Sequence, residues 1–244
     1  MLHNTRGIVL RSVKYGETSL ISTIFTEKLG VESYMVQGVR STSAKNNKSA
    51  ALQPGMLLNL VTYHKPNTNL QRIKEFQYAY LYTSLQERVT KNSIALFSIE
   101  LLLRTMPEHA AMPELFDFAF EYFRQLDLSS DHEIANFPLY FTIQCSKLLG
   151  YEIHGEYSTD TPHLNIQEGA FTHHIPMIGP FASDEEAKAL SALLKADTIT
   201  EVAAIQLNSE IRNRILDWLL EFLKQHTQHM SSLKSLEILR TILH

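Results

Sequence analysis

The sequence predicts an α+β protein in which a small β-barrel precedes an all-α helical bundle. The first part of the chain contains short segments rich in β-branched and aromatic residues, separated by turns that contain glycine. From about Thr83 onward, the apolar residues recur at the spacing of amphipathic helices instead. We therefore expect a β domain at residues 1–82 and a helical domain at residues 83–244, the latter interrupted by a loop-rich insert at about 151–180.

Five strand-like segments fall within about 75 residues, which leaves no room for the crossover connections that parallel strands need. They are TRGIVLRSV, TSLISTIFT, GVESYMVQG, MLLNLVTYH and NLQRIKEFQY. Tight turns join most of them, but one connection is long and polar: GVRSTSAKNNKSAALQPG at residues 38–55. Five short antiparallel strands with one long loop favour a barrel of the OB type, in which loops and one face bind nucleic acid. A small sandwich is the alternative.

The helical part is marked by apolar stripes and by residues that begin and end helices. Pro113 suits a first helical position, and Gly150 suits the position just after a helix end. Two capping boxes are predicted, in which a hydroxyl residue is followed three positions later by a glutamate. They pair Ser183 with Glu186 and Thr198 with Glu201. A further amphipathic helix covers residues 209–226, and a last one begins at about Ser232.

Charge is distributed very unevenly along the chain, although the net charge is only −4. Residues 1–82 hold ten Lys/Arg and four Glu, which gives 10 − 4 = +6, while the remainder gives 12 − 22 = −10. From Ser33 to Lys74 there is no Asp or Glu at all. A basic front half and an acidic back half indicate that the front faces a polyanion. The alternative is a solvated surface with no binding role.

The candidate DNA-contacting residues come mainly from this acid-free stretch. Lysine and arginine neutralise phosphates, and tyrosines stack on unpaired bases. The candidates are Arg40, Lys45, Lys48, Lys65, Arg72, Lys74, Tyr34 and Tyr63, together with Arg11 and Lys14 of the first strand. Because Arg72 and Lys74 are two residues apart, we expect their side chains on the same face of a strand. For either tyrosine, packing inside the barrel is the alternative to stacking.

Neither catalysis nor a cofactor is predicted. The chain has no phosphate-binding loop, no Gly-rich dinucleotide turn, no nucleophile elbow and no His-Glu-x-x-His motif. Its single cysteine, Cys145, excludes an internal disulfide and a cysteine-based zinc cage, and lies in an apolar pattern typical of a buried residue. Four histidines gather in the insert, but neighbours at 173 and 174 should point to opposite faces, so no metal site is expected. The aromatic run between Phe116 and Phe123 is interpreted as core packing on a fully buried helix.

No signal for a membrane or for export is found. The first residues contain no apolar run long enough for a signal peptide, and no segment reaches about 18 uninterrupted apolar residues. We therefore expect a cytoplasmic protein that does not bind a membrane.

The front of the chain resembles the RecO family of bacterial DNA repair proteins. The matching elements occur in order along the first 80 residues or so, and no single one is as specific as a Walker loop. They are the Gly7-Ile8-Val9-Leu10 strand, Tyr15-Gly16-Glu17 with Ser19, Phe25-Thr26 through Gly30, Gly38-Val39-Arg40 and Leu52-Gln53-Pro54. Beyond them, the resemblance rests on the helical pattern and on an insert at the expected place.

This resemblance implies an N-terminal OB-fold, a C-terminal helical domain and a mediator of recombinational repair. Such a protein binds single- and double-stranded DNA, anneals complementary strands and, with RecR, helps to load RecA on DNA coated by single-strand binding protein (SSB), whose C-terminal tail it contacts. Many members carry a four-cysteine zinc module in the insert. Residues 151–180 contain no cysteine here, so we expect no zinc.

Our hypothesis is a non-enzymatic DNA-binding mediator of repair and recombination. One alternative is an adaptor that docks proteins on its acidic helical half, with an incidental basic barrel. Another is an RNA-binding OB module, which would use the 2′-hydroxyl that DNA lacks.

Overall fold

The computed structural model describes residues 1–40, 48–66, 68–227 and 230–243. The chain divides into two compact units, and each is described by itself. The first contains Met1–Ser84 and Met106–Asp127, and the second contains Leu85–Thr105 and Leu128–His244. The first unit thus includes a segment from beyond residue 82. The division of the chain at that residue stays a prediction.

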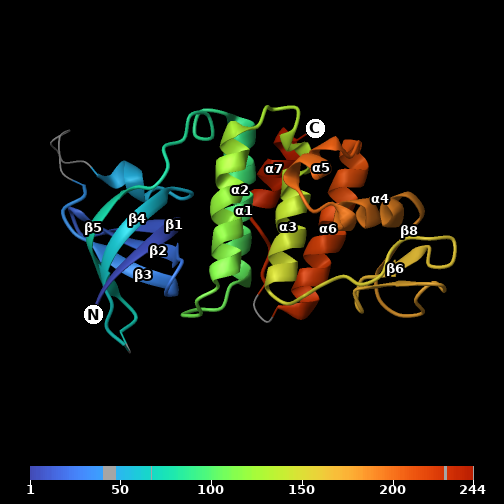
Figure 1. The fold of residues 1–244 in the computed structure, drawn as a ribbon, viewed down its shortest axis with the longest axis horizontal. Coiled ribbons are helices and arrows are strands. Elements are labelled where there is room, and N and C mark those ends of the chain that lie inside the picture. Colours follow the sequence, from blue (N-terminus) through green and yellow to red (C-terminus); the bar gives the residue numbers. More distant parts are fainter. Residues whose placement is uncertain (41–47, 67, 228–229, 244) are drawn as a thin grey trace. The chain divides into compact units, whose positions relative to one another are not determined.

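A five-stranded barrel dominates the first unit, as the sequence predicts (Figure 1). Its strands are β1 (Leu2–Tyr15), β2 (Ser19–Thr26), β3 (Gly30–Val36), β4 (Leu57–Tyr63) and β5 (Gln71–Tyr78). They close in the order β1-β2-β3-β5-β4, and all neighbours are antiparallel except β3 and β5. This closed arrangement of five strands is of the OB type.

The barrel core forms because alternate residues along each strand point inward. On β2 the even-numbered positions are buried, including Leu20, Ile24 and Thr26. Gly7 leaves room inside the barrel for two core side chains, because a Cβ there would lie 2.7 Å from Leu60 Cδ1 and 2.8 Å from Ile24 Cγ2. The long connection between β3 and β4 adds a short 3₁₀ helix, η2 (Ser49–Leu52), whose last two residues are buried in this core.

Helix α2 (Pro113–Leu128) and the segment before it pack against the barrel. The Phe25 and Phe116 rings meet edge to face at 5.3 Å between centroids. The Asp127 carboxylate accepts hydrogen bonds from the backbone N–H groups of Thr83 and Ser84 at 2.8–3.1 Å. Core packing of the α2 aromatics is confirmed at Phe116 and at two further positions, Tyr122 and Phe123. The expected burial on every side is wrong, since Glu114, Asp117 and Glu121 form an exposed polar stripe along α2.

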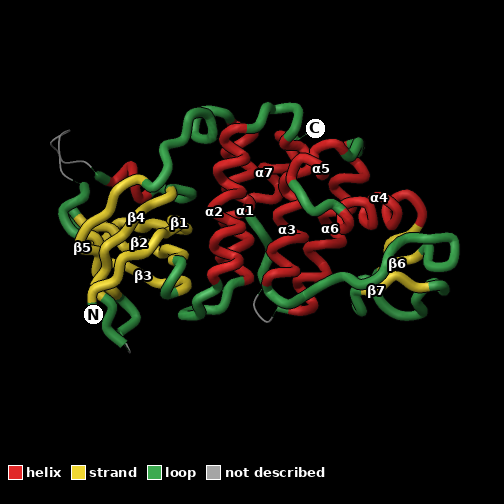
Figure 2. Tube along the Cα trace, viewed as in Figure 1, coloured by secondary structure: helices red, strands yellow, loops and turns green. Residues whose placement is uncertain are grey.

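The second unit is a helical bundle, as predicted (Figure 2). Its helices are α1 (Val89–Thr105), α3 (Phe137–Leu148), α4 (Asp184–Lys195), α5 (Ile199–Ala204), α6 (Ser209–His226) and α7 (Ser235–Ile242), with the 3₁₀ helix η3 (Ile134–Asn136) before α3. Helix α1 packs on α3 and α7, and α3 packs on α5 and α6. Among the described residues, no helix combines the length and the apolar character needed to cross a membrane.

One of the two predicted capping boxes forms. At the start of α5, the Thr198 hydroxyl accepts from the Glu201 N–H at 3.2 Å, and the Glu201 carboxylate accepts from the Thr198 N–H at 3.3 Å. The box at Ser183 is wrong. Glu186 accepts instead from the Trp218 indole N–H at 2.7 Å and pairs with Arg214, so its carboxylate is engaged by α6.

The insert contains a small antiparallel sheet among loops, which the sequence did not predict. Three-residue strands form it in the order β7-β6-β8, with bounds β6 (His163–Asn165), β7 (Ala170–Thr172) and β8 (Phe181–Ser183). Gly169 brings this sheet onto α6, because a Cβ there would lie 2.6 Å from Phe222 Cε2. Such short strands carry too few residues for a period of two to be recognised.

Candidate nucleic-acid interface

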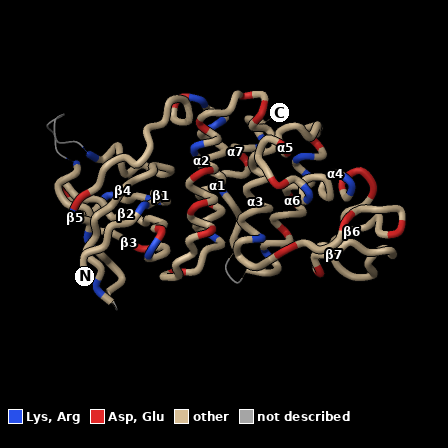
Figure 3. Tube along the Cα trace, viewed as in Figure 1, with Lys and Arg blue, Asp and Glu red and all other residues tan. Residues whose placement is uncertain are grey.

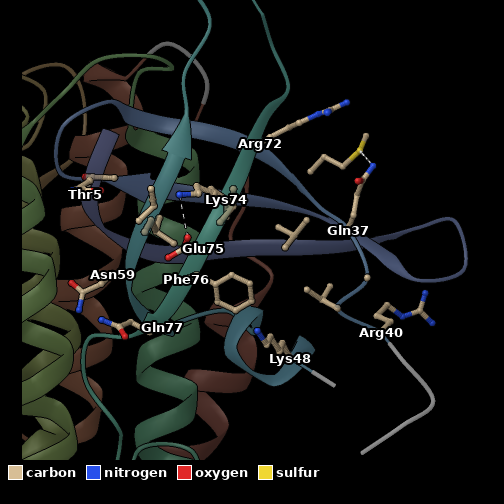
Figure 4. A pocket seen from close by; sticks show the side chains of 18 of the residues that line it. Thr5, Gln37, Arg40, Lys48, Asn59, Arg72, Lys74, Glu75, Phe76 and Gln77 are labelled. Carbon is tan, nitrogen blue, oxygen red and sulfur yellow. Dashed lines mark hydrogen bonds and ion pairs between the residues drawn. The ribbon is translucent and has the colours of Figure 1, made fainter. Parts of the chain in front are cut away.

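The barrel is weakly closed between β3 and β5, and a groove opens beside that seam. The two strands pair at only two positions, Tyr34 with Gln71 and Met35 with Arg72. Beyond them, β3 ends and the chain turns at Gly38, which has a φ of 70°, while β5 continues to Tyr78. The groove has a volume of about 1350 Å³ and is lined by parts of β1, β3, β4 and β5, the β1–β2 turn, and the chain on both sides of residues 41–47 (Figure 4).

The polar connection that begins at Gly38 is anchored to the barrel at both ends. The Arg40 N–H donates to the Thr18 carbonyl, and the Lys48 N–H donates to the Val39 carbonyl, both at 3.1 Å. Val39 is only 4% exposed. Because these contacts fix the backbone, Arg40 and Lys48 are held at the rim of the groove. Lys45, another candidate, lies outside the described residues.

The groove contains more cations than carboxylates. The cations are Arg6, Arg40, Lys48, Arg72 and Lys74, and the carboxylates are Glu17, Glu27 and Glu75. The described lining therefore has a net charge of 5 − 3 = +2. This excess of positive charge makes the groove attractive to a polyanion.

Two of these cations are already engaged by carboxylates. Arg6 Nε lies 3.1 Å from Glu27 Oε2, and Arg6 Nη2 lies 2.5 Å from Asp117 Oδ1. The hydrogen bond from Arg6 lowers the pKa of Glu27 below its usual value, and it raises the pKa of the guanidinium. Lys74 Nζ lies 3.3 Å from Glu75 Oε1. Arg6 and Lys74 are thus partly neutralised within the fold.

The other three cations are available to a ligand. Within the described part of the chain, Arg40, Lys48 and Arg72 make no ion pair, and Arg40 Nη1 donates only to the Gly16 carbonyl at 3.3 Å. Figure 4 shows the Arg72 side chain extending away from the strand, and Arg40 and Lys48 at the opposite edge of the groove. Two guanidinium groups and an ammonium group so placed could each meet one phosphate of an extended strand.

Arg72 and Lys74 are both exposed on β5 and both line the groove, as expected for side chains on one strand face, while Ile73 between them packs against the barrel core. The register between β4 and β5 shifts at this point, so that Thr62 pairs with Ile73 but Val61 pairs with Glu75. Lys74 is the extra residue of this β-bulge, which interrupts the alternation of side chains after Lys74. In Figure 4 the Lys74 ammonium lies beside Glu75, whereas the Arg72 side chain extends away from the strand.

The two candidate tyrosines differ sharply in exposure. Tyr34 is 0% exposed inside the barrel core, and burial raises the pKa of its hydroxyl. Its proposed role in stacking is therefore wrong, because a base cannot reach the ring. Tyr63 is 45% exposed at the end of β4, where it lies directly across from Arg72 in the strand register.

Three candidate cations lie on the barrel but outside this groove. Arg11 and Lys14 are exposed on β1, and Lys65 is exposed in the turn between β4 and β5. None of them is in the groove lining. Their assignment to a DNA site stays a prediction.

The groove also contains residues that the sequence did not single out. Gln37, Asn59 and Gln77 present amide groups to it, and the Phe76 ring lies at its floor (Figure 4). Amides donate to phosphates and to base edges, and an aromatic ring offers a stacking surface. Their polarity at alternating strand positions was visible in the sequence, but nothing indicated that β3 and β5 would separate beside them.

The described residues offer no site for metal binding and no reactive cysteine. No group of three or more His, Cys, Asp or Glu side chains is placed to hold a metal ion. The expectation that His173 and His174 diverge is wrong, because their ring centroids are 4.6 Å apart. Cys145 is fully buried, and burial raises the pKa of its thiol to about 12, which leaves it protonated and unreactive near neutral pH.

Comparison with known proteins places the chain in one family along most of its length. The family model described as Recombination protein O N terminal matches residues 1–82, and that described as Recombination protein O C terminal matches residues 86–164. Similar curated proteins named DNA repair protein RecO occur in Phocaeicola vulgatus (30% identity over 242 residues), Bacteroides fragilis (32% over 244) and Flavobacterium psychrophilum (30% over 241). In each case the match covers 98–99% of both chains. The chain belongs to the RecO family.

Proposed function

We propose that this protein is a DNA-binding mediator of DNA repair and homologous recombination. Its barrel holds the phosphate backbone of single- and double-stranded DNA, and the bound strands are brought together for annealing. The observation that carries this proposal is the groove beside β3 and β5, where Arg40, Lys48 and Arg72 have no carboxylate partner among the described residues. Membership of a family whose curated relatives are named DNA repair proteins supports it.

The partners proposed for the mediator are RecR and the C-terminal tail of SSB. With RecR, the protein would help RecA to load on SSB-coated DNA. The resemblance of the first 80 residues or so to the RecO family supports this role, and no residue of the helical unit is assigned to it. The mediator carries out no covalent step, since it acts by binding and by bringing strands together.

The direct test is annealing of two complementary strands that are each coated with SSB. The protein is expected to accelerate duplex formation over the spontaneous rate, and RecR is expected to bind the resulting complex. Tight DNA binding without faster annealing would contradict the mediator role. Capture of RecR or SSB without any DNA affinity would favour the protein-docking adaptor instead.

A second test addresses the loop and the kind of nucleic acid. Changing Lys45 and Lys48 to Glu is expected to weaken DNA binding for all sequences alike, because phosphate contacts carry no sequence information. Lys28→Glu, at an exposed cation of the β2–β3 turn, is the matched control for each of the two single charge reversals. Unaltered affinity in the double variant would remove the loop from the site. Tighter binding to RNA than to DNA of one sequence would favour an RNA-binding module.

A further inference from the structure

A continuous row of outward-facing side chains runs around the barrel and shares Met35 and Arg72 with the groove lining, but does not include Arg40 or Lys48. Strand register links its members one to the next, from Val13 to Ile21, to Met35, to Arg72, to Tyr63 and finally to Leu2. Directly paired residues have Cβ atoms about 5 Å apart, so neighbouring side chains in this row touch or nearly touch. Most of the row is apolar, and three of its members are 39–49% exposed.

A β-bulge in β1 creates the first part of this row. The register between β1 and β2 shifts between Val9, which pairs with Ile24, and Arg11, which pairs with Thr23. Leu10 is therefore an extra residue, and the strand reverses the side to which its odd-numbered residues point. Val9 lies in the barrel core, whereas Arg11, Val13 and Tyr15 are exposed.

The outer face of β1, β2 and β3 around this row contains no carboxylate. Its outward positions alternate with the buried ones. They are Arg11, Val13 and Tyr15 on β1, Ser19, Ile21 and Thr23 on β2, and Ser33 and Met35 on β3, with Gln37 just after it. Glu32, the acidic residue of β3, faces the other way and is 4% exposed. A polyanion can therefore cross these three strands without meeting a carboxylate. Beyond them, Glu17 lies in the β1–β2 turn, and Glu75 on β5 pairs with Lys74.

We propose that this face, which we name the base track, receives the unpaired bases of single-stranded DNA. Tyr15 and Tyr63 are the stacking platforms, at 52% and 45% exposed, with Ile21 and Met35 as the apolar surface between them. Arg11 and Arg72 supply charge complementarity for the phosphates beside the bases. The inference rests on the proposed function, and it adds where the bases lie and why single strands are held differently from duplexes.

Contacts of the base track with unpaired bases predict a difference between single-strand and duplex binding that phosphate contacts alone do not predict. Bases of a duplex are stacked on each other and paired, so they offer no free face to a tyrosine. Base–aromatic stacking therefore contributes to single-strand binding only. The groove cations, in contrast, contribute to both forms, because both carry phosphates.

The test compares three probes with the full-length protein: a thymidine oligonucleotide, an abasic oligonucleotide of equal length, and a duplex. The abasic strand has the same phosphates and no bases. The variants are Tyr15→Ala and Tyr63→Ala, with Tyr78→Ala as the matched control. Tyr78 is a 40% exposed tyrosine at the far end of β5, outside both the groove and the base track.

The wild-type protein is expected to bind the thymidine strand at least about 5-fold tighter than the abasic strand. Each base-track substitution should weaken thymidine binding by about 5- to 150-fold. It should leave duplex and abasic binding, and the salt slope, unchanged. Tyr78→Ala should change none of these values.

Three results would overturn the inference, and they differ from a failure of the proposed function. Equal wild-type affinity for thymidine and abasic strands would show that bases are not contacted. A thymidine preference that survives in both tyrosine variants would place the bases elsewhere. Equal losses on duplex and single strand would mean that the tyrosines support the barrel rather than contact bases. Absence of binding to all three probes would instead remove the proposed function itself.

Discussion

Cations in two parts of the same groove differ in whether the fold already pairs them. Next to residues 106–127, Arg6 pairs with Glu27 and Asp117. Beside the seam between β3 and β5, Arg40 and Arg72 have no carboxylate partner among the described residues. The comparison separates cations that hold the fold together from cations that are free to meet a ligand.

The net charge of the first unit is smaller than that of residues 1–84 alone, because residues 106–127 are acidic. Residues 1–84 contribute 10 − 4 = +6, and residues 106–127 contribute 1 − 5 = −4, so that the unit as a whole has a net charge of +2. Figure 3 shows the acidic residues of α2 and the Lys and Arg residues of the barrel strands. Residues 106–127 therefore balance much of the basic excess predicted from the sequence, so a ligand site depends on which cations stay unpaired.

The largest effect on stability is expected at Asp127, which fastens the end of the barrel segment to α2. The buried carboxylate accepts hydrogen bonds from Thr83 N–H, Ser84 N–H and the Tyr80 hydroxyl. Asp127→Ala leaves these donors unsatisfied, so the free energy of unfolding should fall by about 3 to 5 kcal/mol. Urea denaturation followed by circular dichroism measures it. A loss below about 0.5 kcal/mol would contradict a structural role for this side of the barrel.

A smaller effect is expected at Gly30, where the segment before α2 lies closest to the barrel. A Cβ at Gly30 would lie 2.3 Å from the Ala110 carbonyl oxygen, and the residue has a φ of 72°. Gly30→Ala should lower the free energy of unfolding by about 2 to 3 kcal/mol, from backbone strain and from the clash.

Gly16 is the matched control for this substitution. Its φ is 62°, but a Cβ there would meet no atom within 4 Å. Gly16→Ala should therefore cost only the conformational part, about 1 kcal/mol. If both substitutions have the same cost under identical denaturation conditions, the contact with Ala110 is not a constraint on the fold.

The smallest effect on stability is expected at Arg6, which is partly exposed. Arg6→Ala should lower the free energy of unfolding by about 1 kcal/mol or less at neutral pH. Because Arg6 lowers the folded pKa of Glu27, its stabilisation is present above the ordinary pKa of a glutamate. It is lost as the pH falls through the lowered value, so wild type and variant should converge in acid. A difference that grows toward low pH would contradict this pairing.

The sequence predicted the barrel well because its strands are rich in β-branched and aromatic residues and closely spaced, with glycine in the tight turns between them. It also placed Arg40, Lys48 and Arg72 in one acid-free stretch, and the structure brings these three to one groove. It could not locate the bulges at Leu10 and Lys74, because a register shift depends on the partner strand rather than on local composition.

Long-range contacts explain the other differences. Tyr34 and Tyr63 look alike in the sequence, yet their positions on β3 and β4 bury one and expose the other. Likewise, the pairing of Arg6 with Asp117 joins residues 111 positions apart, which no local pattern reveals. The helices were recognisable from their spacing, but which of them would pack on the barrel was not.

The salt dependence of single-strand binding tests the central claim most directly. About four phosphate contacts predict a slope of log K against log salt near −3. Replacing Arg40, Lys48 and Arg72 together with alanine should make this slope shallower by about 2, whereas Arg6→Ala should leave it unchanged. An unchanged slope in the triple variant, or a loss in Arg6→Ala equal to that of an unpaired groove cation, would contradict the division between paired and available cations.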